Sequence, residues 1–120
     1  MTESADRQLI LTVVFFKTAS GREPVREWLR SLVHDARRDI GYDIKTAQYG
    51  WPLGMPLVRK LERDLWEVRS AFPAGIARVM FTVQGGHMVL LHGFVKKSQK
   101  TPASDLQTAR QRLAELRGAK

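Results

Sequence analysis

The first apolar segment of the chain, residues 9–17, is rich in β-branched and aromatic side chains. Such side chains fit the pleated surface of a β-strand. The cluster Thr18-Ala19-Ser20-Gly21 that follows is typical of a turn. We therefore predict a strand in this segment, buried on both of its faces.

Two helical patterns come next. Ser20 is a candidate N-cap, and Pro24 suits a first helical turn. Apolar residues then recur at the spacing of one helix face, at Val25, Trp28, Leu29, Leu32 and Val33. A second pattern runs from about residue 35 to residue 49 and stops before Gly50 and Pro52. Its apolar stripe is thinner and consists of Ile40, Ile44 and Ala47.

The rest of the chain is rich in strand patterns and ends in a helical one. Segments 55–61, 65–70, 75–83 and 87–95 are separated by short turns, and Gly85-Gly86 is typical of a two-residue hairpin. Thr101-Pro102 opens a final helical stripe of Leu106, Ala109, Leu113 and Leu116. The pattern predicts one α+β domain over residues 1–120 in the order β-α-α-β-β-β-α, with its helices on one face of an antiparallel sheet. Residues 1–8 are expected to be frayed.

Composition excludes several classes of protein. The chain has 120 residues, of which 43% are hydrophobic and 27% charged, an ordinary globular balance with room for one core. It contains no cysteine, which excludes disulfides, cysteine-ligated zinc or iron–sulfur sites and a thiol nucleophile. The polar N-terminus is unlike a signal peptide, and no apolar run approaches the ~20 residues of a membrane span. We expect a soluble, cytoplasmic protein.

Charge points to the kind of partner. Lys and Arg number 20 and Asp and Glu 12, which gives a net charge of +8. Between Glu67 and Asp105 there is no carboxylate, although the stretch holds Arg69, Arg78, His87, His92, Lys96, Lys97 and Lys100. An antiparallel sheet keeps one face free, so this stretch predicts a free face of one positive sign, typical of a nucleic-acid or phosphate site. The alternative is a merely basic surface.

The residue types in this stretch can cleave RNA without a metal. That reaction needs a base for the 2′-hydroxyl, cations for the phosphorane and an acid for the leaving 5′-oxygen. We expect Arg69 and Arg78 to meet across a hairpin, where a pair of guanidinium groups grips a phosphate. The alternative for Arg69 is an ion pair with Glu67. Lys60, on the first strand after the helices, is a further candidate.

His92 is the candidate acid or base, because imidazole titrates near neutral pH. With a two-residue turn at Gly85-Gly86 it would pair near Val79 on the core face, whereas a turn one residue longer would place it beside Arg78. The sequence leaves both registers open, and a structural, partly buried histidine is the alternative. Candidates for binding RNA are Arg59, Lys96, Lys97 and Lys100. Glu62, Asp64 and Glu67 are interpreted as a charged connection rather than as ligands of a two-metal nuclease.

Three runs of the sequence have a family resemblance: LVRKLERDLWEVR at residues 57–69, IARVMF at 76–81 and LLHGFVKKSQKTP at 90–102. Together with the segment PVREWL at 24–29, they resemble the RelE/ParE toxin superfamily, and most of all its HigB-type, phage-derived branch. The resemblance covers nearly the whole chain. It implies a RelE-like fold and a toxin of a type II toxin–antitoxin pair.

The resemblance also implies an activity and the residues that carry it. Most members cleave mRNA in the ribosomal A site without a metal or other cofactor, and they leave a 2′,3′-cyclic phosphate. By position, family residues are matched by Lys60, Arg69, Arg78, Lys96 and Lys97. The family's tyrosine near the final helix has no counterpart, because Tyr42 and Tyr49 both lie in the helical region. His92 or a lysine would then be the base.

The partners implied are mRNA, the 70S ribosome and an antitoxin. We expect the antitoxin to be a helix-turn-helix protein with an acidic or otherwise complementary segment, because this chain carries +8 and charge complementarity speeds association. Two other functions stay open, since fold alone does not determine function. Members of the ParE kind inhibit gyrase by binding, and a basic sheet can bind nucleic acid without cleaving it.

Overall fold

The computed structural model describes residues 10–72, 75–96 and 101–118. The elements are β1 (Thr12–Phe15), α1 (Pro24–Ser31), α2 (His34–Tyr49), β2 (Val58–Glu62), β3 (Leu65–Phe72), β4 (Gly75–Gln84), β5 (His87–Lys96) and α3 (Ala103–Gly118). Residues 1–8, for which fraying was expected, and Lys97 and Lys100 lie outside the described residues. Within the described ranges, no helix has the length and apolar character needed to cross a membrane.

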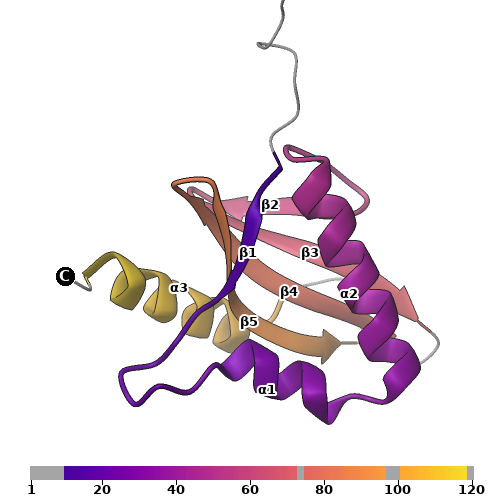
Figure 1. The fold of residues 1–120 in the computed structure, drawn as a ribbon, viewed down its shortest axis with the longest axis horizontal. Coiled ribbons are helices and arrows are strands. Elements are labelled where there is room, and N and C mark those ends of the chain that lie inside the picture. Colours follow the sequence, from indigo (N-terminus) through magenta and orange to yellow (C-terminus); the bar gives the residue numbers. More distant parts are fainter. Residues whose placement is uncertain (1–9, 73–74, 97–100, 119–120) are drawn as a thin grey trace, which may run out of the picture.

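The strands form one sheet in the order β1-β5-β4-β3-β2 (Figure 1). Strands β2 to β5 pair antiparallel, and β1 pairs in parallel with β5. The predicted α+β class is therefore confirmed, although the sheet is mixed. Four strands follow α2, one for each of the four predicted strand segments, although the predicted order counted three.

β1 lies at an edge of the sheet, since β5 is its only neighbour among the described strands. Thr12 and Val14 of this strand are exposed. The prediction of a strand buried on both faces is therefore wrong. The apolar run is longer than the strand, and its fully buried members, Leu11 and Phe16, flank β1 rather than belong to it.

Helices cover both faces of the sheet. Val79 and Phe81 of β4 pack in the core that α1 and α2 close, whereas Met80 between them packs in a second core with Leu113 of α3. Figure 1 shows α1 and α2 in front of the sheet and α3 behind it. The expectation that the helices share one face is wrong, because alternate residues of β4 and β5 are apolar on both faces and each face needs a cover.

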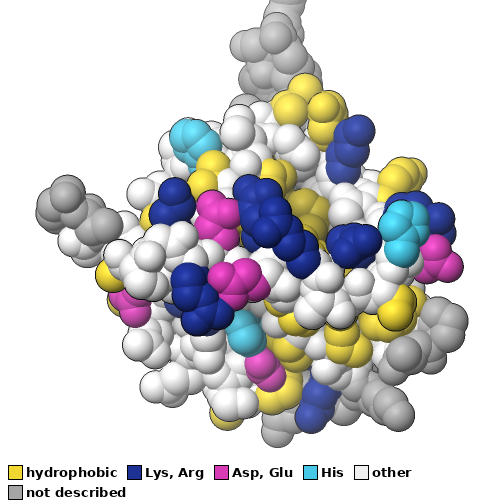
Figure 2. All heavy atoms as spheres, turned by 60° about the horizontal axis from the view of Figure 1, so that its bottom comes forward, with side chains coloured by type: hydrophobic (Ala, Val, Ile, Leu, Met, Phe, Trp, Pro, Cys, Tyr) yellow, Lys and Arg dark blue, Asp and Glu magenta, His cyan; other side chains and the backbone are white. Residues whose placement is uncertain are grey.

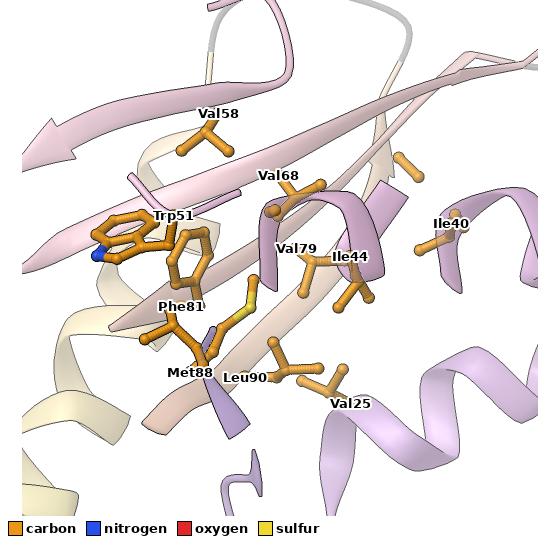
Figure 3. Close-up of a cluster of buried hydrophobic side chains, with 13 residues drawn as sticks. Val25, Ile40, Ile44, Trp51, Val58, Val68, Val79, Phe81, Met88 and Leu90 are labelled. Carbon is orange, nitrogen blue, oxygen red and sulfur yellow. The ribbon is translucent and has the colours of Figure 1, made fainter. Parts of the chain in front are cut away.

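The larger core lies between α1, α2 and the sheet (Figure 3). The predicted α2 stripe is confirmed, since Ile40, Ile44 and Ala47 are all buried. Trp51, which follows α2, packs edge-on against Trp66 of β3 with ring centroids 5.0 Å apart. Because side chains alternate along a strand, burial of one face of the sheet under α1 and α2 leaves every second strand residue on the other face, toward α3.

The approach of α1 to the sheet depends on a glycine. Trp28 of α1 lies so close to Gly93 of β5 that a Cβ on this glycine would overlap the indole ring. Such contact accounts for a glycine in the middle of a buried strand. The helix begins at Pro24 with Glu23 as its N-cap, and not at the predicted Ser20 cap, because residues 18–22 form a hydrogen-bonded turn in which Gly21 adopts a φ of 92°.

Candidate functional site

Arg69 and Arg78, the two arginines expected to meet across a hairpin, are directly opposite each other on β3 and β4. Side chains alternate along a strand, so both point to the face that also carries Met80, the face covered by α3. On the far side of Arg78 lies Phe94 of β5, whose ring centroid is 6.0 Å from the guanidinium carbon. The structure thus brings the two arginines together.

A buried carboxylate lies between these arginines. Arg69 Nη1 donates to Glu67 Oε2 at 3.2 Å, so the ion pair considered as the alternative for Arg69 is present. Arg78 Nη1 donates to Thr101 Oγ1 at 3.2 Å, and the Thr101 hydroxyl in turn lies 3.5 Å from Glu67 Oε1. Glu67 and Arg78 are both 0% exposed. The network links β3 and β4 to Thr101, two residues before α3.

Positive charge exceeds negative charge at this network. Arg59 of β2 lies opposite Glu67 and adds a third guanidinium to the face. Burial lowers the pKa of the Arg78 guanidinium, the positive charges of Arg69 and Arg59 lower it further, and the Glu67 carboxylate opposes them. A further anion here would therefore be stabilised by charges that one carboxylate does not balance. We call Arg59, Glu67, Arg69 and Arg78 the arginine cluster.

Lys60, the third candidate for catalysis, lies elsewhere. It pairs with Trp66, so its side chain lies on the face of α1 and α2, with Nζ 5.9 Å from the Trp66 ring centroid. One residue separates it from Arg59, and one residue in a strand reverses the side chain's direction. The structure therefore brings Arg59, and not Lys60, to the face of Arg69 and Arg78.

His92 lies on the same face as Arg78. The hairpin has the two-residue Gly85-Gly86 turn, which by itself would pair His92 with Val79. A register shift between Met80 and Phe81 changes this, so that His92 pairs with Met80. Of the two registers that the sequence left open, the structure therefore has the one that places the histidine on the face of the arginines, because a bulge re-aims side chains. Its ring stacks on Phe94 at 5.6 Å between centroids.

Two residues of α3 contact His92, and the sequence analysis missed both. Asp105 Oδ1 lies 2.7 Å from Nε2 of the imidazole. Arg112 Nη1 donates to the Leu91 carbonyl at 2.8 Å and lies 3.4 Å from His92 Nδ1. Burial lowers the pKa of Arg112. Asp105 and Arg112 are seven residues apart, a spacing that puts them on one side of a helix beside the apolar stripe, and that spacing is the signal that could have found them.

The prediction of a free sheet face with one positive sign is wrong. α3 covers part of this face, and Glu67 and Asp105 are carboxylates within it. Figure 2 shows Lys and Arg side chains next to Asp and Glu side chains on the side of the molecule turned forward there. Lys96, a candidate for binding RNA, is exposed at the end of β5. On the described part of this face, positive charge therefore exceeds negative charge at the arginine cluster, but the face carries both signs.

The carboxylates of the β2–β3 connection pair with α3. Arg110 donates to both oxygens of Glu62, at 2.7–3.1 Å, and Arg117 donates to Asp64 Oδ2 at 2.7 Å. Among the described residues no group of three or more His, Asp or Glu side chains is arranged to hold a metal ion. These carboxylates therefore act as tethers for α3 against the sheet.

Comparison with known families shows the family of the chain. Residues 27–114 match the family model described as phage-derived protein Gp49-like (DUF891). The chain belongs to this Gp49-like family. The family is a toxin-like group allied to RelE, which is compatible with the toxin of a toxin–antitoxin pair and implies an antitoxin partner. The match includes the arginine cluster, His92, Asp105 and Arg112. No curated protein matches the chain significantly.

Proposed function

We propose that this Gp49-like protein is the toxin of a type II toxin–antitoxin pair of the HigB type, and that it cleaves translated mRNA on the ribosome without a metal. The observation that carries the proposal is the shared face of Arg69, Arg78 and His92. Cations for a phosphorane and an imidazole for proton transfer are thereby supplied by three adjacent strands.

The residues have separate roles in this proposal. Arg69, which is partly accessible, contacts the scissile phosphate, and Arg78 beneath it acts through its charge because its side chain is 0% exposed. Arg59 stabilises the same phosphate from β2. His92 transfers the proton of the 2′-hydroxyl, which attacks the phosphorus and leaves a 2′,3′-cyclic phosphate.

Further basic residues would hold the RNA and the ribosome. Lys96 is exposed at the end of β5, two residues after Phe94, and it adds a cation that contacts the phosphate backbone. Lys97 and Lys100, which follow it in the sequence, are proposed for the same role. Lys60 faces away from the cluster, so we assign it a contact with ribosomal RNA rather than a part in catalysis.

The test is primer extension on a reporter mRNA after brief induction of the protein, with translation running and with initiation blocked. We expect cuts within codons only when the message is translated. Arg69→Gln should abolish the cuts, whereas Arg30→Gln, an exposed arginine of α1 away from the cluster, should leave them. Cuts that persist in Arg69→Gln, or that occur without translation, would contradict the proposal.

A second function is favoured by one observation. Arg78 is fully buried and Arg69 is paired with Glu67, an arrangement that also suits a protein that binds its target without cleaving RNA. A gyrase inhibitor of the ParE kind would arrest growth with the reporter mRNA intact and with altered DNA supercoiling. A domain that only binds nucleic acid would give an affinity that falls steeply with salt and no cleavage product.

The antitoxin is proposed to be a helix-turn-helix protein with an acidic segment, since the chain has a net charge of +8. Co-expression with a candidate antitoxin of this kind should restore growth, and the two proteins should co-purify. A candidate that leaves the arrest unrelieved would refute this pairing.

A further inference from the structure

His92 is held between one acidic and one basic group of α3. Asp105 Oδ1 lies 2.7 Å from its Nε2, and Arg112 Nη1 lies 3.4 Å from its Nδ1. The side chains of His92 and Asp105 are 18% and 23% exposed, so the contact lies mostly out of water. A carboxylate, an imidazole and a guanidinium therefore form a short chain at the contact of β5 with α3.

The two partners dictate the tautomer of the imidazole. A guanidinium group donates hydrogen bonds and has no acceptor, so Nδ1 must present its lone pair to Arg112. A neutral imidazole with its lone pair on Nδ1 carries its hydrogen on Nε2, where Asp105 accepts it. The contact of Arg112 with Nδ1 is long for a hydrogen bond, and Arg112 has a shorter bond to the Leu91 carbonyl, at 2.8 Å. Arg112 therefore keeps its main hydrogen bond when a substrate hydroxyl replaces it at Nδ1.

We propose that Asp105 is the positioning residue that makes His92 the general base, and that the proton is accepted at Nδ1. The inference rests on the proposed nuclease function and names the atom and the second residue that this function requires. As the 2′-oxygen bonds to phosphorus, its proton moves to Nδ1 and the bond from phosphorus to the 5′-oxygen breaks. The 5′-oxygen takes a proton from water, and the imidazolium returns its proton to water, so the step balances.

Among the described residues that contact His92, Asp105 is the one whose charge stabilises the imidazolium. From β4 the opposite residue is the uncharged Met80, and from β5 the stacked residue is Phe94. From α3 the charged neighbours are Asp105 and Arg112. Arg112 is itself influenced by Glu115, which favours its charge, and by Arg22, which opposes it. Removal of the Asp105 charge should therefore make protonated His92 less favourable.

Two variants separate positioning from tethering. Asp105→Asn removes the charge beside His92, and Glu62→Gln is a matched control because it weakens another tether of α3, the contact with Arg110, without touching His92. Single-turnover cleavage of mRNA in programmed ribosomes is measured between pH 5.5 and 8.5. We expect Asp105→Asn to lower the maximal cleavage rate about tenfold or more and to leave unchanged the protein concentration that half-saturates the ribosomes. In the plot of rate against pH, the midpoint of the rise on the acidic side should move to lower pH. Glu62→Gln should keep the wild-type profile.

A second measurement does not depend on activity. Long-range proton–nitrogen NMR spectra of the imidazole report which nitrogen carries hydrogen in the free protein. We expect the Nε2–H tautomer of His92 in the wild type and a mixture of tautomers in Asp105→Asn. An Nδ1–H tautomer in the wild type would overturn the inference, as would equal losses and unchanged pH profiles in both variants. Wild-type protein that leaves translated mRNA intact would instead refute the nuclease function, whatever the tautomer.

Discussion

Glu67→Gln is the perturbation that tests the arginine cluster most directly. The change removes the carboxylate that is 0% exposed and pairs with Arg69 at 3.2 Å, while keeping nearly the same shape. Removing one partner of a buried ion pair costs about 3–5 kcal/mol. We take the lower end, about 3 kcal/mol, because Arg69 keeps 10% exposure and water can solvate it in part. A domain of ordinary stability has only about 5–15 kcal/mol in total.

The assay is urea unfolding followed by tryptophan fluorescence, with and without added phosphate. We expect a lower midpoint for Glu67→Gln and a partial recovery in phosphate, because an anion that binds the folded cluster stabilises it by mass action. Glu27→Gln is the control, since it breaks an exposed pair with Arg22 and should leave the midpoint unchanged. A loss of about 1 kcal/mol or less for Glu67→Gln is the value for a surface pair, and it would refute the claim that the cluster is desolvated.

Three further predictions concern single residues. Gly93→Ala should lower the free energy of unfolding by about 1–3 kcal/mol, measured by urea unfolding, because the new Cβ overlaps the indole packed on it; an unchanged midpoint would contradict that packing. The hydrogen bond from Arg110 lowers the pKa of the Glu62 carboxyl in the folded protein. The stability that Glu62 contributes is therefore complete above the ordinary glutamate pKa and is lost as the pH falls below it. Urea midpoints measured between pH 6 and 3 should fall less in Glu62→Gln than in the wild type. Arg59→Ala should slow single-turnover cleavage at saturating ribosomes about tenfold or more, whereas Lys60→Ala should change only the ribosome concentration needed for half-saturation; the reverse order would show that Lys60, and not Arg59, acts at the phosphate.

Local patterns were sufficient to predict most of the elements and one key contact. The i, i+3, i+4 spacing predicted both N-terminal helices, and the stripe of Ile40 and Ile44 is buried as expected. Arg69 and Arg78 could be paired because few residues separate the two strand patterns in the sequence, and a short connection leaves little freedom of register. Contacts of this kind depend on neighbours in the sequence, which is why the sequence shows them.

The rest of the site depends on one-residue shifts and on distant packing. The register shift at Met80 places His92 on the arginine side, and the sequence leaves this register open. Asp105 reaches His92 only because α3 crosses the second face of the sheet, which was expected to be open. The sequence shows that these residues are present, but it does not show on which face of the sheet each side chain lies.

Burial decides how this site uses its charges. Arg78 has 0% exposure and stays charged, because the pKa of a guanidinium is far above neutral pH even when burial lowers it. Its attraction for an anion is therefore little screened by salt, in contrast to that of exposed Lys96. Since Glu67 offsets only part of the cluster's charge, the folded protein retains a local positive potential that a scissile phosphate would neutralise. The same network joins β3 and β4 to Thr101, two residues before α3, so the position of this helix and the charge of the cluster are physically coupled.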